Sequence, residues 1–211
     1  GVLKHVVEQD PTRRFNLIRR TKYSIIFNEH EGIARIDFPK REEQVLRVDY
    51  WAMQELGPGL QRPYQILSRG FGLKTPIEEK LYLPGIPQED HFLECFLPWK
   101  KLNIAIAPAS DSPRKAMNPL TWHKLVDYLL AEGAFVFQVG LLNEQHIRNA
   151  YSVRGMTTPQ QLIYLLKKCN MIITSDNFIM HAAHLANTAA VVVWGPTSHD
   201  VYGYPEQTHI Q

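Results

Sequence analysis

The sequence predicts an α/β protein whose second half is a parallel sheet with helices on both faces. From Asn103 onward, short apolar runs alternate with longer segments in which apolar residues recur every three or four positions. The apolar runs are nearly continuous, which is typical of strands buried on both faces. No tight-turn signal joins one run to the next, so helices must connect consecutive strands, which then run parallel.

The first 83 residues predict a mixed α/β order with weaker patterning. The opening segment is expected to be a helix to about Glu8 with apolar residues on one side, Val2, Leu3, Val6 and Val7. This helix is already under way at Gly1, so we expect the chain to be a fragment with an opening strand upstream. The elements that follow are expected to be a strand at 14–20, a helix at 22–30, a strand at 34–39, a helical stretch at 50–56, a short helix at 62–72 and a strand at 80–84.

Residues 84–101 are the predicted boundary between two domains, at 1–98 and 102–211. They contain several prolines and a cluster of apolar residues, a composition that favours an irregular connection. With 211 residues and 45% hydrophobic content, the chain can form one large core or two modest ones.

The second half predicts strands and helices in regular alternation. One helix has Asn118 as its N-cap and Pro119 at its first position, and Thr158 and Pro159 repeat this start signal for another. Strands are expected at 103–109, 134–140, 170–176 and 189–196, and helices at 118–133, 143–150, 157–169 and 178–188.

Small, hydroxyl-bearing or charged residues follow every strand of this half. They are the loop 108–115, Gly140 with Glu144 a few residues on, the segment 175–177, and the segment 195–198. In an open parallel sheet, ligands bind at the carboxyl ends of the strands. The repetition at one sheet edge therefore predicts a polar ligand.

The loop 108–115 is the most informative of these strand ends. Ser110 and Ser112 offer hydroxyls, Arg114 and Lys115 offer positive charge, and the helix behind them presents unpaired N–H groups. A phosphate or diphosphate suits this set. The alternative is an ordinary capped helix with solvated basic residues. Neither a P-loop nor a dinucleotide-binding glycine motif is present.

Asp176 ends one of the predicted strands and has two interpretations. It can accept hydrogen bonds from ligand hydroxyls, or it can cap the helix that follows. His181 and His184 share a face of that helix, but no further ligand completes a metal set, so no metal site is expected. We expect His181 either to form a hydrogen bond with a sugar hydroxyl or phosphate, or to be a core residue whose hydrogen bonds are made within the protein. We expect His184 to be a packing residue.

Bulk properties exclude some functions. No run approaches the ~20 apolar residues of a membrane span, so the protein is expected to be soluble. A net charge of +2 is too small to indicate nucleic-acid binding.

Cys95 and Cys169 match no metal spacing and are expected to be buried thiols in a reducing compartment. One basic cluster stands out, and it is either a solvated rim or a surface for an anionic acceptor or membrane: Arg13, Arg14, Arg19, Arg20 and Lys22.

The segments "IAPASDSPRK", "GLLNEQ" and "VRGMTTPQQLIYLLKKCNMIITSDNFIMHAAHLANTAAVVVWGPT" resemble the carboxyl-terminal half of glycosyltransferase family 9, the ADP-heptose:lipopolysaccharide heptosyltransferases. The resemblance is specific over 103–203 and looser over 1–83. It implies a GT-B fold, in which two Rossmann-like domains face a cleft and the second holds a nucleotide-sugar donor. Direct displacement at the anomeric carbon, with inversion, is the implied reaction.

The resemblance also implies roles for individual residues. Ser110, Asp111 and Lys115 match the diphosphate loop, and Lys115 would stabilise the leaving group. Glu144 and Met156 match the positions that hold ribose and base. Asp176, Asn177 and His181 match the element that contacts the donor sugar and diphosphate. The expected donor-binding set is completed by Ser112, Arg114, Gly195 and Thr197. No cofactor is implied, since the nucleotide sugar, an ADP-sugar, is a co-substrate.

Some features depart from the family. Phe178 stands where the family usually keeps a glycine, and the acidic catalytic base would lie upstream of Gly1. The chain also ends short of the family's closing segments. The leading hypothesis is a cytoplasmic sugar transferase, peripheral to the inner membrane, acting on an anionic bacterial glycan or glycolipid. The alternative is a catalytically silent nucleotide-sugar-binding module. An epimerase of the same fold is not supported, because no second acid/base pair is seen.

Overall fold

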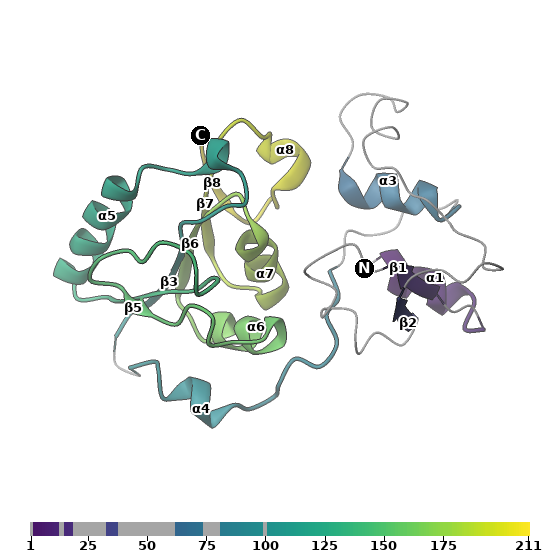
Figure 1. Cartoon of the computed structure of the whole chain (residues 1–211), viewed down its shortest axis with the longest axis horizontal. Helices are drawn as coiled ribbons and strands as arrows, with labels where there is room; N and C mark the ends of the chain where they lie inside the picture. The colour runs from purple at the N-terminus through teal and green to yellow at the C-terminus, as the bar shows by residue number, and fades with distance from the viewer. Residues whose placement is uncertain (1, 13–14, 19–32, 38–61, 74–80, 99–100) are drawn as a thin grey trace. The chain divides into compact units, whose positions relative to one another are not determined.

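The computed structural model describes residues 2–12, 15–18, 33–37, 62–73, 81–98 and 101–211. The chain divides into two compact units, Gly1–Gly85 and Ile86–Gln211 (Figure 1). Within the described residues, no helix combines the length and apolar character that crossing a membrane requires.

The first unit contains the expected opening helix and strands. Helix α1 spans Val2–Gln9, and strands β1 (Phe15–Ile18) and β2 (Ile33–Asp37) pair in parallel. Val6 and Val7 are buried, which confirms an apolar side on α1. Helix α3 (Pro63–Gly70) confirms the short helix predicted at 62–72. The helices predicted at 22–30 and 50–56, and the basic cluster from Arg13 to Lys22, lie outside the described residues.

One strand prediction in this unit is wrong. Residues 81–84 form no strand, although their apolar run suggested one. Strand character needs a pairing partner, and the sheet described in this unit consists of β1 and β2 alone. Pro84 and Gly85, the latter at φ +73°, then turn the chain away from an extended course.

The second unit is built on a six-stranded sheet of order β5-β4-β3-β6-β7-β8. Every neighbouring pair is parallel, as the continuous apolar runs predicted. The strands are β3 (Asn103–Ala107), β4 (Phe135–Gln138), β5 (Tyr151–Ser152), β6 (Met171–Ser175), β7 (Ala190–Val193) and β8 (Thr208–Ile210).

Helices cover both faces of this sheet, with α5 (Pro119–Ala131) on one face and α6 (Pro159–Lys167) and α7 (Phe178–Ala186) on the other (Figure 1). The predicted caps are confirmed. The Asn118 side chain accepts from the amide of Leu120, and Thr158 forms a capping box with Gln161.

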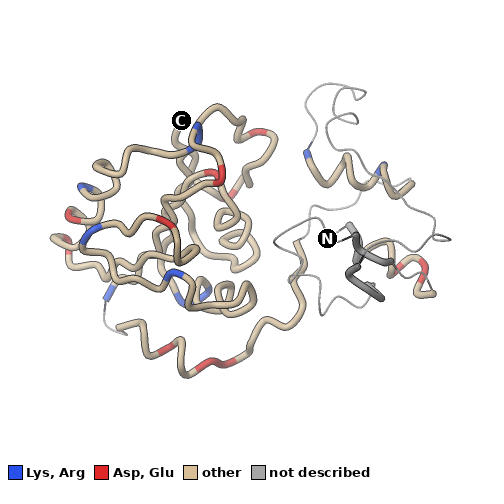
Figure 2. The backbone as a smooth tube through the Cα atoms, viewed as in Figure 1, with Lys and Arg blue, Asp and Glu red and all other residues tan. Residues whose placement is uncertain are grey.

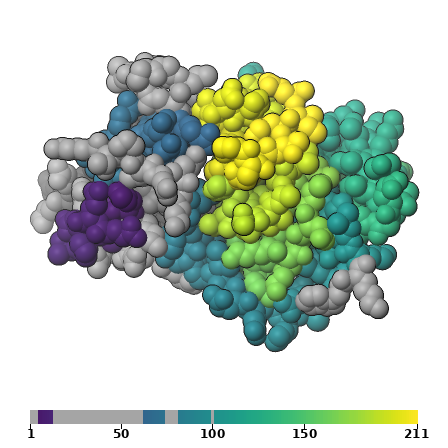
Figure 3. Space-filling view, turned by 180° about the vertical axis from the view of Figure 1, so that it is seen from behind, coloured from purple at the N-terminus to yellow at the C-terminus, as the bar shows by residue number. Residues whose placement is uncertain are grey.

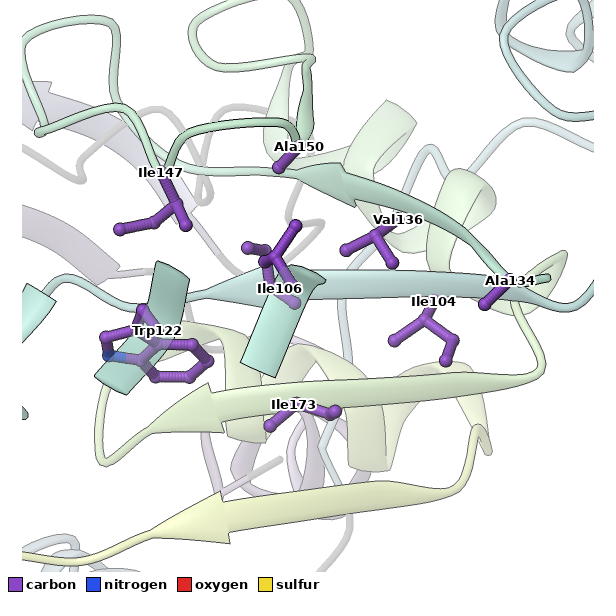
Figure 4. Close-up of a cluster of buried hydrophobic side chains, with 9 residues drawn as sticks. Ile104, Ile106, Trp122, Ala134, Val136, Ile147, Ala150 and Ile173 are labelled. Atoms are coloured by element: carbon purple, nitrogen blue, oxygen red, sulfur yellow. The ribbon is translucent and has the colours of Figure 1, made fainter. Parts of the chain in front are cut away.

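The core between α5 and the sheet contains alternate strand residues. Trp122 and Val126 of α5 are buried against Ile104, Ile106 and other strand side chains (Figure 4). The same cluster includes Ala134, Val136, Ile147, Ala150 and Ile173. Burying these side chains is the main stabilising contribution, at about 25 cal/mol per Å² of apolar surface. It holds the sheet rigid behind the loops at its carboxyl edge.

The helix predicted at 143–150 is wrong. These residues form turns, and Asn149 takes φ +68°. The fully buried Gln138 explains the difference: its side chain donates to the carbonyl of Gln145 (2.9 Å) and accepts from the amide of Ile147 (2.8 Å). A buried amide needs these partners, so the tertiary contact overrides local helix propensity. Strands β5 and β8 and helix α8 (His199–Tyr202) were not predicted.

The segment 86–98 groups with the second unit, whereas the sequence assigned it to the first domain. Within it, helix α4 (His91–Glu94) is tied to α6. Gln161 donates to Asp90 (3.2 Å), and the Glu94 carboxylate pairs with Lys168 (3.2 Å) and accepts from the Tyr164 hydroxyl. The hydrogen bond from Tyr164 is the main reason that the pKa of Glu94 lies below its ordinary value, and Lys168 adds to it.

The two cysteines differ from one another. Cys95 is exposed at the end of α4, so the expectation that it is buried is wrong. Cys169 is largely buried, and this burial raises the pKa of its thiol to about 12. Neither is part of a metal site: among the described residues, no three His, Cys, Asp or Glu side chains are grouped so as to hold an ion.

Candidate functional site

The sheet has a topological switch point between β3 and β6. The chain adds β4 and β5 on one side of β3, then crosses over and adds β6, β7 and β8 on the other. At such a point the connections leave the sheet in opposite directions, which opens a crevice at the carboxyl ends of the two central strands. The loop 108–115 and the segment 175–177 meet there.

Asp176 is the centre of the contacts at this crevice. Its side chain is 7% exposed, and its Oδ2 lies 2.8 Å from the ammonium of Lys115. The same oxygen accepts a hydrogen bond from the Thr197 hydroxyl. The structure thus joins three predicted site residues from three different strand ends. This cluster is called the Asp176 cluster below, and it comprises Lys115, Asp176, Asn177 and Thr197 with the serines of the loop 108–115.

The alternative interpretation of Asp176, as the cap of α7, is wrong. The cap is Asn177, whose side-chain oxygen accepts from the amide of Ile179 (2.7 Å). The same oxygen accepts from the hydroxyl of Thr174 (3.0 Å), and its amide nitrogen donates to the carbonyls of Ala107 (3.1 Å) and Ala109 (2.6 Å). Every hydrogen-bonding position of this amide is used, so Asn177 ties the ends of β3 and β6 together.

The loop 108–115 is held against the same strand end. The Ser110 hydroxyl donates to the backbone carbonyl of Asp176 (3.2 Å), and the Ser175 hydroxyl donates to the carbonyl of Pro108 (3.0 Å). A single 3-10 turn, Pro113–Lys115, then directs Lys115 toward Asp176. The other predicted residues of this loop are less enclosed: Asp111 and Arg114 are exposed, and Ser112 is half-buried.

Gly195 allows the 3-10 turn to approach β7. A Cβ built on Gly195 would lie 2.8 Å from the backbone oxygen of Arg114 and 3.1 Å from the Cα of Lys115. Real side chains do not fit at such distances to a backbone, so only glycine is accommodated without a shift. The close approach carries the chain on to Thr197, within reach of Asp176.

Glu144 and Met156 belong to a second group, at the ends of β4 and β5 and at the same edge of the sheet. This group is called the Glu144 loops below, and it spans 140–147 and 153–156. Gly140 takes φ +134°, and a Cβ there would overlap the Glu144 carboxylate. The amide of Gly155 donates to the carbonyl of Gly140 (2.8 Å), which joins the two loops.

Two apolar side chains of the Glu144 loops are far more exposed than Asp176. Met156 is 44% exposed and Leu142 is 75% exposed. The Arg154 guanidinium donates to the backbone oxygen of Glu144 and to the Ser152 hydroxyl (3.1 Å), which fixes the backbone and leaves the tips of the loops open. Exposed apolar side chains near a carboxylate are suited to a nucleobase and its ribose.

His181 lies in the second turn of α7 and contacts a residue that sequence reasoning missed. Its Nδ1 is 2.8 Å from the hydroxyl of Tyr204. His184 stacks on the same Tyr204 ring at 3.8 Å, which fits the packing role expected for it, and also bonds Glu206 (2.5 Å). The sequence signal available was the tyrosine-rich segment just after "GPT", but the strand β8 that fixes it is too short to predict.

Phe178 is the first residue of α7 and is 40% exposed, immediately after the Asn177 cap.

Charged residues of both signs are interspersed along the described backbone of the second unit (Figure 2). The electrostatics of the site therefore come from particular contacts, above all Lys115 with Asp176, rather than from a surface of one sign.

A six-stranded parallel sheet with a lysine, a carboxylate and hydroxyls at its switch point defines an α/β protein with charged and polar side chains where folds of this type bind their ligands. The sequence profile of glycosyltransferase family 9 (heptosyltransferase) matches residues 57–209. The chain therefore belongs to this family, which confirms the resemblance seen in the sequence. No curated protein sequence matches the chain.

Solved structures of glycosyltransferases share the fold. They include ADP-heptose LPS heptosyltransferase II of E. coli, with 22% identity and a TM-score of 0.51 over 64% of this chain and 47% of that one. The iron-containing dodecameric glycosyltransferase TibC of enterotoxigenic E. coli H10407 matches all of this chain and 57% of its own, with 14% identity and a TM-score of 0.71.

A second TibC structure, a complex with ADP-D-beta-D-heptose, also matches all of this chain and 58% of its own length, with 14% identity and a TM-score of 0.68. The chain thus spans about half the length of these relatives. At these identities the likeness establishes the fold.

Proposed function

We propose that this protein transfers a heptose-like sugar from an ADP-sugar, with inversion, to a glycan or glycolipid of the bacterial surface. The observation that carries the proposal is the Lys115–Asp176–Thr197 contact at the switch point of the sheet. Membership of family 9 supports the reaction class. The TibC complex with ADP-D-beta-D-heptose supports an ADP-sugar donor, since TibC shares the fold.

In this proposal the Asp176 cluster is the subsite for the diphosphate and donor sugar. The Lys115 ammonium is partly exposed and carries the charge that a leaving diphosphate needs. The acceptor hydroxyl attacks the anomeric carbon, the bond from that carbon to the phosphate oxygen breaks, and ADP departs. Charge grows on the diphosphate in the transition state, so Lys115 and the hydroxyls of Ser110 and Ser112 stabilise that state more than the ground state.

The remaining predicted residues complete the donor site. Arg114 and Asp111 lie at the exposed edge of the diphosphate loop, and Glu144 bonds the ribose while Met156 contacts the base. Asn177 and Gly195 act through the backbone that they hold, since the Asn177 amide is fully used within the protein. His181 contributes a ring nitrogen to the donor. The reaction needs neither cofactor nor metal.

The whole enzyme, in this proposal, has the two-domain GT-B arrangement, with the acceptor side formed by the first domain. An acidic base there would deprotonate the acceptor. The acceptor is anionic, as the basic cluster from Arg13 to Lys22 suggests, and the enzyme works in the cytoplasm at the inner membrane surface.

Thermal unfolding of the full-length protein with nucleotides tests the donor assignment. A ligand present at 100 times its Kd adds about 2.7 kcal/mol to the stability of the folded state. ADP and ADP-sugars should raise the Tm more than UDP- or GDP-sugars. Lys115→Ala should abolish the shift, whereas Lys124→Ala, an exposed lysine on α5, should keep it. A larger shift with UDP- or GDP-sugars would reject the ADP-sugar donor.

Transfer is tested separately, by incubating an ADP-heptose donor with lipopolysaccharide core acceptors and following ADP release and the product's anomeric configuration. Retention of configuration would contradict the inverting mechanism. Donor binding without transfer to any acceptor would favour the alternative, a silent nucleotide-sugar-binding module.

A further inference from the structure

The residue that holds His181 is Tyr204, in the segment between α8 and β8. Tyr204 is 3% exposed, and its hydroxyl lies 2.8 Å from His181 Nδ1. The two rings meet edge to face, with centroids 5.6 Å apart and planes at 90°. This geometry places the phenol oxygen at the Nδ1 side of the imidazole.

Tyr204 is itself fixed on α7 by several contacts. The His184 ring stacks on it at 3.8 Å with an interplanar angle of 6°, and His184 is held in turn by Glu206. The backbone oxygen of Tyr204 accepts from the amide of Gln207 (3.0 Å) and bonds His209 Nε2 (3.0 Å).

The neighbouring residue Gln207 ties the same segment to α7. It is buried, and its side chain donates to the carbonyl of Met180 (2.7 Å). The carboxyl-terminal residues, yellow in Figure 3, lie directly against the yellow-green atoms of the preceding part of the unit. Tyr204 is thus a rigid support, because its ring and its backbone are each bound on α7 or β8.

We propose that Tyr204 is a positioning residue that fixes the orientation and the tautomer of His181 for donor binding; the catalytic consequence rests on the proposed function. A phenol is a better hydrogen-bond donor than a neutral imidazole N–H, and an imidazole nitrogen is the better acceptor. The Tyr204 hydroxyl therefore donates to Nδ1, and the single proton of the neutral ring sits on Nε2. His181 then presents an N–H donor, which suits a diphosphate oxygen or a sugar hydroxyl.

The substitution Tyr204→Phe separates positioning from packing, because it keeps the ring that stacks on His184 and removes only the hydroxyl. In ¹⁵N-labelled full-length protein, the His181 Nδ1 resonance should move downfield, to the position of an imidazole nitrogen that accepts no hydrogen bond. The control Tyr128→Phe, on the exposed face of α5, should leave it unchanged. An unchanged Nδ1 resonance in Tyr204→Phe would overturn the proposal.

Kinetics then test whether this positioning matters for transfer. Losing one oriented hydrogen bond should lower kcat/KM for the ADP-sugar about tenfold. In a His181→Ala background, Tyr204→Phe should have no further effect, since the two residues act as a unit. Additive effects of the two substitutions would overturn the proposal. If the wild-type protein neither bound nor used ADP-sugars, the proposed function would fail, while the Nδ1 shift would still report on Tyr204.

Discussion

The two halves of the candidate donor site are built in different ways. In the Asp176 cluster, the buried Asp176 and its half-buried neighbours form hydrogen bonds with one another and with the backbone. The Asn177 amide alone ties the end of β3 to the junction between β6 and α7. In the Glu144 loops, hydrogen bonds fix the backbone while Leu142 and Met156 remain exposed. This difference fits the proposed roles, because charge on a leaving group is stabilised best by groups already in place, whereas an apolar contact with a base tolerates adjustment.

The largest effect is expected from Asp176→Asn, which removes the charge that orients Lys115 and keeps the side-chain shape. Transfer should fall roughly 100- to 1000-fold, because a preorganised electrostatic group is displaced. ADP should bind at least as tightly as before, since the freed ammonium attracts phosphate more strongly. Initial rates and ADP calorimetry check both results. Asp200→Asn, at a side chain that is 83% exposed, is the control and should transfer normally. Normal transfer by Asp176→Asn would contradict the view that the Asp176 cluster is a preorganised subsite.

The next effect is expected from Asn177→Ala. Truncation removes the cap of α7, at a cost of about 1 kcal/mol. It also removes the donor to the carbonyls of the buried Ala107 and the half-buried Ala109, at about 1–3 kcal/mol. Urea denaturation should therefore give a stability loss of about 3 kcal/mol. Asn118→Ala removes the cap of α5, whose side chain accepts from the local amide of Leu120, and should lose about 1 kcal/mol. Equal losses would mean that Asn177 is merely a cap.

Much of this organisation follows from local sequence. Asn118 with Pro119, and Thr158 with Gln161, are start signals that need no tertiary context, and the continuous apolar runs identify a parallel sheet. Since strand ends in such a sheet share an edge, the neighbourhood of Lys115, Asp176 and Thr197 could also be predicted. The contact of both Lys115 and Thr197 with one oxygen of Asp176 could not be predicted, because it depends on a close backbone approach at Gly195.

Where sequence reasoning failed, a distant contact decided the structure. The helix expected at 143–150 is replaced by turns because Gln138 is buried and satisfied by that loop. Segment 86–98 groups with the second unit, where Glu94 contacts Tyr164 and Lys168, both of which lie far from Glu94 in the sequence. Tyr204 was missed because β8, the strand that fixes its segment, has only three residues, too few for a period of two to be recognised in the sequence.

A smaller effect is expected from Gly195→Ala. The new methyl group would meet the Arg114 oxygen at 2.8 Å, and the backbone must shift, which costs about 1–3 kcal/mol. The shift moves Lys115, so ADP affinity should also fall. Gly133→Ala is the matched control: its Cβ meets nothing within 4 Å, but φ is +84°, so it should lose about 1 kcal/mol through backbone strain and keep ADP affinity. Unchanged ADP affinity in Gly195→Ala would mean that the close approach does not position Lys115.

The smallest effect is expected in the Glu144 loops, from Met156→Ala. Because Met156 is 44% exposed, its removal should change the free energy of unfolding by at most about 0.5 kcal/mol. Its contact with the base should contribute about 1 kcal/mol to binding, so ADP affinity should fall about fivefold while inorganic diphosphate binds as before. Leu120→Ala, at a 65% exposed leucine of α5, should change neither. Calorimetry with both ligands measures the two affinities. An equal loss of affinity for ADP and diphosphate would mean that the two halves of the site are coupled. The contrast between a rigid phosphate subsite and an adjustable base subsite would then no longer hold.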